Sequence, residues 1–254
     1  MIIVNNAFVY IHHPKTGGTF VTEMLRKVAS LDNGFNIQEF SGKLKHAGIN
    51  KIPEEHQHLP VVINVRNVFE HYVSRYTFRW WANPERAKNR FDLEKVLKEF
   101  PNFPELSFSE FLRLFNQWSL RRGMPEKKAK TLTKHNIGYN SWVLAQLVTR
   151  KTIKWLQSLD EMDESNLNNI FQKIRFLRTE NLNAELYELL KEYKISEDKL
   201  SSILSAKPIL PKKGGRGKQK ETWHSYFSRD DVELAKKKDR MYFRLFPDME
   251  PSDR

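Results

Sequence analysis

The feature that most constrains the fold is a run of proline, glycine and threonine between an apolar stretch and a helical pattern. Residues 7–12 read Ala-Phe-Val-Tyr-Ile-His, which is short, apolar and rich in residues that favour β-strands. The breaker sequence Pro14-Lys15-Thr16-Gly17-Gly18-Thr19 comes next. After it, apolar residues recur at the spacing of one helix face, at Val21, Met24, Leu25 and Val28. The order strand, glycine loop, helix predicts the start of a parallel β-α-β unit.

Two further apolar stretches predict neighbouring strands. Val61–Val65 and Ile174–Arg178 each precede a helical pattern, over 69–76 and 182–193 respectively. Strands that alternate with helices favour an α/β fold, a three-layer sandwich with a central parallel sheet flanked by helices. A chain of 254 residues can bury a substantial core. We therefore predict a single domain over residues 1–254.

The remaining segments predict mostly helices and loops. Residues 82–104 are polar and contain proline, which favours a surface excursion, and Ser107 or Ser109 is a plausible N-cap for a helix over 108–115. Residues 229–246 predict one last helix. Residues 207–220 carry six Lys or Arg, three Gly and no acid, which predicts a basic loop.

The composition favours anionic partners. Lys and Arg number 43 and Asp and Glu 31, so the net charge is +12. The chain has no cysteine, which excludes a disulfide scaffold and a thiolate metal site. The first residues lack the pattern of a signal peptide, and no stretch approaches the ~18 apolar residues of a membrane helix. We expect a cytoplasmic protein with no membrane partner.

The glycine loop has the chemistry of a phosphate cradle. Glycines let backbone N–H groups turn toward an anion, and the start of a helix adds its positive dipole end. Lys15 contributes a charge, and Thr16 and Thr19 contribute hydroxyl groups. The loop differs from a Walker A motif because its lysine precedes the glycines. The plainer alternative is an ordinary Gly-Gly turn beside a surface lysine.

A second cluster follows the second predicted strand. Arg66 comes directly after Val65, and Ser74 lies two turns into the next helix. Ligands of α/β sheets bind at the carboxyl ends of strands, so Arg66 is expected at the same crevice as Lys15. Its planar guanidinium group suits a terminal phosphate, beside which Ser74 can donate a hydroxyl hydrogen.

Together these clusters resemble sulfotransferases that use 3′-phosphoadenosine-5′-phosphosulfate. The segment 11–19 resembles the family's phosphosulfate loop, and the segment 65–76 resembles its 3′-phosphate motif, roughly fifty residues later. Residues 176–182 are similar to a later strand and helix start of the family, and residues 213–218 to its basic glycine loop. The chain departs from the family at Phe20, where Ser or Thr is common, at Val68, where Pro is usual, and at His71, where Arg is common.

The resemblance implies a P-loop-like sulfotransferase architecture and an in-line transfer of the sulfuryl group without a metal. The donor is released as 3′,5′-adenosine bisphosphate. The implied role of Lys15 is catalytic, because it stabilises the leaving phosphate. The residues implied to bind the donor are Lys15, Thr16, Gly17, Gly18, Thr19, Phe20, Arg66, Ser74, Arg216, Gly217 and Lys218, of which Arg216 and Lys218 are candidates for a closing lid.

The attacking hydroxyl also needs a base, and histidine is the usual one near neutral pH. His46 lies where related sulfotransferases often carry theirs, so we expect it to be the catalytic base. His13 borders the loop and is an alternative. For His12 we expect a packing role at the strand end, and for His71 a surface or capping role.

The acceptor stays open between a small molecule and a glycan, and between a hydroxyl and an amine. An anionic acceptor and an ordinary solvated face are both compatible with a group of basic residues: Arg75, Arg79, Arg86, Lys88 and Arg90. Two other functions compete, a basic nucleic-acid-binding protein and a kinase-like nucleotide-binding protein. No recognition motif for nucleic acid is present, and we expect a monomer or a homodimer.

Overall fold

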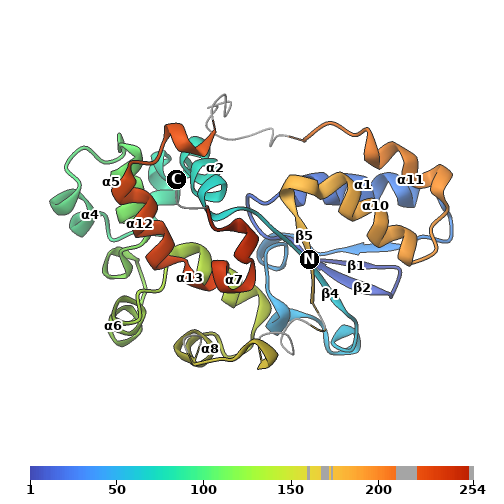
Figure 1. Ribbon diagram of the computed structural model, residues 1–254, viewed down its shortest axis with the longest axis horizontal. Helices are drawn as coiled ribbons and strands as arrows, with labels where there is room; N and C mark the ends of the chain where they lie inside the picture. The colour runs from blue at the N-terminus through green and yellow to red at the C-terminus, as the bar shows by residue number, and fades with distance from the viewer. Residues whose placement is uncertain (159–160, 167–171, 173, 210–221, 252–254) are drawn as a thin grey trace. The chain divides into compact units, whose positions relative to one another are not determined.

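The computed structural model describes residues 1–158, 161–166, 172, 174–209 and 222–251. These residues form two compact units (Figure 1). The first contains residues 1–66 and the described residues from 144 to 209, and the second contains 67–143 and 222–251. The boundary falls inside helix α7 (Tyr139–Val148). The expectation of a single domain over 1–254 stays a prediction.

The second unit is helical. Its helices besides the first half of α7 are α2 (Val68–Phe78), α3 (Pro84–Lys88), α4 (Leu93–Glu99), α5 (Phe108–Phe115), α6 (Glu126–Lys134), α12 (Arg229–Lys238) and α13 (Arg240–Leu245). The predicted cap is confirmed, because Ser107 and Glu110 form a reciprocal capping box at the start of α5. The segment 82–104 is mostly exposed, as predicted, but it is folded into α3 and α4 and buries Phe91 and Val96. The single helix over 229–246 is wrong, because Asp239 separates α12 from α13.

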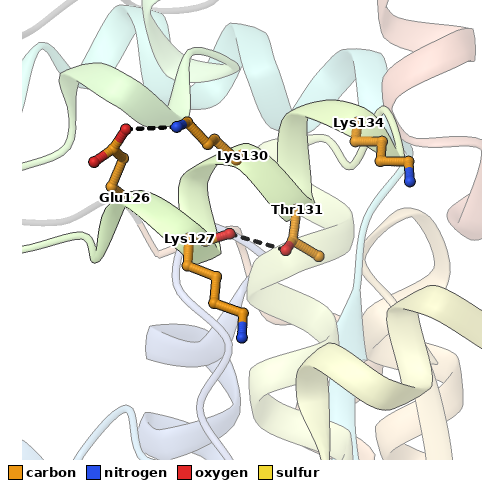
Figure 2. A pocket seen from close by; sticks show the side chains of 5 residues that line it. All are labelled: Glu126, Lys127, Lys130, Thr131 and Lys134. Carbon is orange, nitrogen blue, oxygen red and sulfur yellow. Dashed lines mark hydrogen bonds and ion pairs between the residues drawn. The ribbon is translucent and has the colours of Figure 1, made fainter.

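A surface hollow of about 440 Å³ lies along α6 in this unit (Figure 2). Its lining is a row of polar side chains on one helix, all exposed except the half-buried Thr131: Glu126, Lys127, Lys130, Thr131 and Lys134. Lys130 pairs with Glu126 at 2.7 Å, one turn away. Such a row is the ordinary solvated face of a helix, and no predicted site residue lines it.

The first unit is built on one five-stranded mixed sheet. Its strands are β1 (Ile2–Val4), β2 (Phe8–Ile11), β3 (Ile37–Glu39), β4 (Val61–Val65) and β5 (Ile174–Arg178), in the order β3-β1-β2-β4-β5. β2, β4 and β5 are parallel, with Ile11 opposite Ile63 and Ile63 opposite Phe176. β1 is antiparallel to both β2 and β3. The α/β class is therefore confirmed, and the wholly parallel sheet is corrected to a mixed one.

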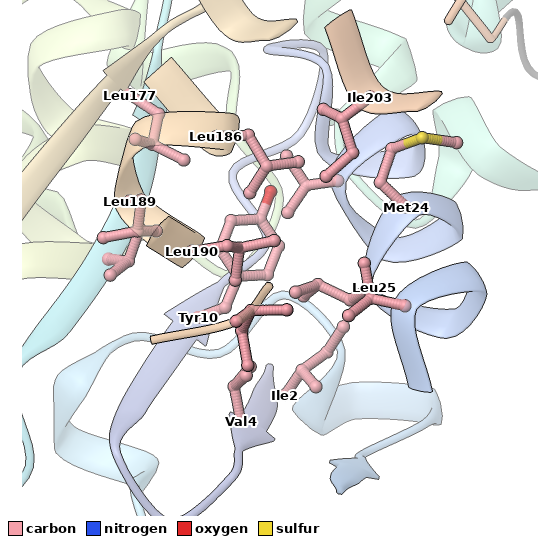
Figure 3. Close-up of a cluster of buried hydrophobic side chains, with 14 of the residues drawn as sticks. Ile2, Val4, Tyr10, Met24, Leu25, Leu177, Leu186, Leu189, Leu190 and Ile203 are labelled. Atoms are coloured by element: carbon pink, nitrogen blue, oxygen red, sulfur yellow. The ribbon is translucent and has the colours of Figure 1, made fainter. Parts of the chain in front are cut away.

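The sheet is buried because its central strands are apolar along their whole length. Every residue of β2 and β4 is buried, which is the pattern of strands covered on both faces. Helices α1 (Gly18–Leu31), α10 (Leu182–Glu192) and α11 (Glu197–Leu204) pack on one face. Figure 3 shows Met24 and Leu25 of α1, Leu186, Leu189 and Leu190 of α10 and Ile203 of α11 around Tyr10. α8 (Thr152–Ser158) also belongs to this unit.

The three parallel strands place their carboxyl ends at one edge of the sheet. β2 leads into the glycine loop, β4 into Arg66, and β5 into the short 3₁₀ turn η6 (Thr179–Asn181). The sequence elements that carry the predicted chemistry of the first unit are therefore neighbours in space. This is the edge at which ligands of α/β sheets bind.

Candidate functional site

The glycine loop is fixed to the ends of all three parallel strands. The carbonyl oxygen of Thr16 accepts a hydrogen bond from Asn64 Nδ2 at 2.9 Å and lies 2.9 Å from the Thr179 hydroxyl. The Thr16 hydroxyl in turn donates to the carbonyl oxygen of His13 at 2.9 Å. His13 Nδ1 lies 3.0 Å from the carbonyl oxygen of Asn64. Because three of these bonds are buried and the fourth is partly buried, the conformation of the loop is set before any ligand arrives.

The backbone of the loop has the form of an anion-binding nest. Lys15 has φ 70° and Gly17 has φ 87°, both in the left-handed region. A lysine there costs about 1 kcal/mol or more, a strain that clusters at ligand-binding sites. Alternation of left-handed and right-handed residues turns successive N–H groups toward one point. The two left-handed residues on either side of Thr16 are compatible with such a nest.

The helix after the loop adds to this polarity. Gly17 is the N-cap of α1, no side chain caps that helix, and no acidic residue lies in its first turn. Its first N–H groups and its positive dipole end therefore lie beside the loop. Arg66 Nη1 lies 3.5 Å from the carbonyl oxygen of Lys15, at the long limit of a hydrogen bond. The structure thus brings Lys15, Arg66 and the start of α1 together.

Gly18 leaves space for the imidazole ring of His12. A Cβ atom at residue 18 would overlap the imidazole ring of His12, which is buried. The His12 ring meets the His46 ring edge to face at 4.7 Å. This confirms the packing role expected for His12 and places His46 next to the strand that leads into the loop.

The hydrogen bond of His46 decides its tautomer. His46 Nδ1 lies 3.0 Å from the carbonyl oxygen of His12. A carbonyl oxygen only accepts, so Nδ1 carries the hydrogen in the neutral ring, and the free lone pair is at Nε2. The side chain of His46 is also exposed over part of its surface. His46 therefore offers an oriented and accessible base.

Both rings of this pair favour the neutral form. Burial, followed by the nearby His46 and Lys45, lowers the pKa of His12 from 6.5 to about 3. Burial of the packed side of its ring also lowers the pKa of His46 below 6.5, although the bond to His12 opposes this. A neutral His46 at neutral pH is what a general base requires.

The other predicted site residues have varied positions. Thr19 is half-buried, whereas Phe20 belongs to the apolar core with 4% of its surface exposed, so only its backbone faces the loop. The Thr16 hydroxyl was expected to face a ligand, but it donates its hydrogen to the carbonyl oxygen of His13. Ser74 is half-buried on α2 and belongs to the second unit. Arg216, Gly217 and Lys218 lie outside the described residues.

Asn64 and Thr179 are residues of the site that the sequence analysis missed. Asn64 is fully buried in an otherwise apolar strand, which is the signal that marks it. Thr179 directly follows β5, so its position is visible once β5 is paired with β4. The surface role expected for His71 is wrong, because His71 is fully buried.

Two comparisons with known proteins found no match for the chain. No protein-family model matches the chain, and no curated protein is significantly similar to it. Among the described residues, no group of three or more His, Asp or Glu side chains is placed to hold a metal ion. None of the helices described is long and apolar enough to cross a membrane. A function is therefore inferred from the loop, Arg66 and His46.

Proposed function

We propose that this protein is a sulfotransferase that moves the sulfuryl group of 3′-phosphoadenosine-5′-phosphosulfate to a hydroxyl or amine of a small-molecule or glycan acceptor. The observation that carries the proposal is the position of Arg66 against a loop in which Lys15 and Gly17 are left-handed, at the uncapped start of α1. Two phosphates of one nucleotide need two cationic anchors near each other. The sequence resemblance supplies the identity of that nucleotide.

In this proposal the protein positions the reactants and stabilises charge. Sulfuryl transfer makes demands similar to those of phosphoryl transfer, with in-line attack and charge that builds on the leaving oxygen. Lys15 neutralises that charge, and the N–H groups of Gly17, Gly18, Thr19 and Phe20 hold the 5′-phosphate. Arg66 binds the 3′-phosphate. His46 removes the proton of the acceptor through Nε2.

Nucleotide selectivity tests the proposal directly. Without magnesium, 3′,5′-adenosine bisphosphate should raise the unfolding temperature much more than 5′-AMP, because a ligand that binds only the folded state stabilises it. Arg66→Ala should weaken binding of the bisphosphate by about 10- to 100-fold, the value of one or two hydrogen bonds to a charged group, and change binding of 5′-AMP little. Calorimetric titration measures both affinities.

A matched control is Lys27→Ala, which removes one charge from the exposed face of α1 and should leave both affinities unchanged. Equal losses for both nucleotides in Arg66→Ala would contradict the assignment of Arg66 to the 3′-phosphate. Stabilisation that requires magnesium and ATP would favour the kinase-like alternative instead.

A second prediction concerns His46. His46→Ala should lower kcat by roughly 10²- to 10⁴-fold, the usual contribution of a general base, and leave the affinity for the bisphosphate unchanged. In the parent protein the base acts when neutral, so kcat/KM should fall as the pH falls through the pKa of His46. Since that pKa lies below 6.5, the acid limb should lie below pH 6.5 and should vanish in the variant.

Rate profiles over pH for the parent, His46→Ala and the exposed-residue control His58→Ala measure this effect. The control should behave like the parent. If His13→Ala loses the acid limb and His46→Ala retains it, the assignment of the base to His46 is wrong.

A further inference from the structure

Two arginines of the second unit pack against the same tyrosine. Arg75 lies on α2 with 4% of its surface exposed, and Arg121 follows the 3₁₀ turn η5 (Trp118–Leu120). The guanidinium carbon of Arg75 lies 4.8 Å from the centre of the Tyr139 ring, and that of Arg121 lies 4.7 Å from it. Two positive groups thus share one ring, and Arg121 and Tyr139 are themselves half-buried.

Aromatic rings surround Arg121 on further sides. Its guanidinium carbon lies 4.6 Å from the centre of the Phe91 ring and 4.9 Å from that of Phe115. Its Nη2 donates to the carbonyl oxygen of Phe115 at 2.8 Å. The rings hold the guanidinium plane in place, and they provide no acceptor for the remaining N–H groups.

Several donors of the two arginines are buried without an acceptor. Nε and Nη2 of Arg75 and Nε of Arg121 have no hydrogen-bond partner in the described chain. Neither arginine forms an ion pair with a described carboxylate. The buried Asp239 accepts hydrogen bonds from the Tyr72 hydroxyl at 2.6 Å and from the Ser141 N–H at 2.7 Å instead. Buried charges are ordinarily paired, so this arrangement lacks its counter-charge.

The excess of positive charge also shifts the pKa values in this cluster. Burial, together with Arg90 and Arg75, lowers the pKa of Arg121 to about 10, although Tyr139 opposes this. Burial by itself would raise the pKa of Tyr139, but Arg75, Arg121 and Arg90 outweigh it and lower that pKa. Arg75, Arg121 and Arg90 are the charged side chains that act on Tyr139, and all three favour an anion near its ring.

We propose that Arg75 and Arg121, beside Tyr139, form a binding site for a compact oxyanion, namely a carboxylate, sulfate or phosphate group. Guanidinium groups bind such groups through paired N–H donors. Nε and Nη2 of Arg75 are such a pair, and Nε of Arg121 adds a third donor. The site belongs to the second unit and does not depend on the proposed sulfuryl transfer.

The other basic residues near Arg75 in the sequence differ from it. Arg79 pairs with Glu105 at 2.7 Å, and Lys88 lies 3.7 Å from Glu85. Both are exposed, so they form the solvated face that the sequence left open.

A surface hollow of about 350 Å³ borders Phe91, and Lys88 and Arg122 line it together with Asp92 and Leu93. Phe91 is one of the rings that contact Arg121.

Inorganic sulfate is the probe, with chloride at equal ionic strength as the reference. The parent for this test is Arg66→Ala, so that the anchor proposed for the first unit makes no contribution. Sulfate should raise the unfolding temperature of this parent more than chloride does. Adding Arg75→Met should raise the sulfate concentration needed for half of that gain by about tenfold or more, because the charged hydrogen bonds are lost. In chloride, Arg75→Met should be at least as stable as the parent, because an unpaired buried charge is removed.

Arg86→Met is the matched control, since Arg86 is an exposed arginine of the same unit, and it should keep the full sulfate response. An equal sulfate response in Arg75→Met and Arg86→Met would overturn the site. So would a loss of stability in Arg75→Met that is the same in sulfate and in chloride, because Arg75 then serves only to pack on Tyr139.

If Arg75→Met does not fold, the charge-preserving variants Arg75→Lys and Arg121→Lys test the sulfate site instead. A weakened sulfate response in either one supports the site, and an unchanged response in both overturns it. A second readout is the titration of Tyr139, measured as the tyrosinate absorbance that is lost in Tyr139→Phe. Bound sulfate should raise the pKa of Tyr139, and no shift between sulfate and chloride would contradict the proposal.

Discussion

Lys15→Ala should lower the rate of sulfuryl transfer by roughly a thousandfold while the protein stays folded. Lys15 is the side chain proposed to meet the charge that builds on the leaving phosphate, and loss of one such preorganised group typically costs about 10²- to 10³-fold in kcat. Lys15 is half-buried and lies outside the apolar core, so its side chain contributes little to folding. Single-turnover rates at saturating donor measure the effect on the chemical step.

The conservative variant Lys15→Arg separates charge from geometry. It keeps a cation on the loop, so it should retain part of the rate, whereas Lys15→Ala should retain almost none. The unfolding temperatures of both variants should lie close to that of the parent. A Lys15→Ala protein with full activity would remove the loop from the proposed mechanism, whatever the role of Arg66.

The central strands were predictable because their apolar runs are continuous. β4 and β5 have the predicted bounds, and β2 differs from its predicted range only at its ends. β1 and β3 were missed because each has three residues, too few for a periodic signal. Asn5 and Asn6 carried a usable signal, since their φ values of 51° and 49° form the turn between β1 and β2. Asparagine tolerates this conformation better than most residues.

The site was predictable where it is local in sequence and not where it depends on pairing. The order of strand, loop and helix was enough to select Lys15 and Gly17, whose backbone is left-handed as a nest requires. The bonds from Asn64 and Thr179 to Thr16 depend on strands that are far apart in the sequence. The sequence explains Gly18 only as a flexible residue, whereas the structure shows that it makes room for the His12 ring.

Gly48→Ala should destabilise the fold strongly, and more than Gly18→Ala. A Cβ atom at residue 48 would lie 2.7 Å from the Cα atom of Leu147 and would overlap the carbonyl oxygen of Gln146. Both are backbone atoms of helix α7, so no side-chain rotation relieves the overlap, in contrast to the His12 ring beside Gly18. Overpacking of this kind costs about 3 kcal/mol, or roughly 6–12 °C in the unfolding temperature.

The matched control is Gly34→Ala. A Cβ atom there would meet only the carboxylate of Asp32, at 3.4 Å, so this variant should unfold within about 2 °C of the parent. Gly48 also lies two residues after His46, so the displaced segment should move the proposed base and lower kcat in the fraction that stays folded. Thermal unfolding of both variants, followed by circular dichroism, measures the difference. Equal unfolding temperatures for the two variants would mean that the segment around His46 does not pack against α7 as closely as the structure has it, and the position assigned to the base would then lose its support.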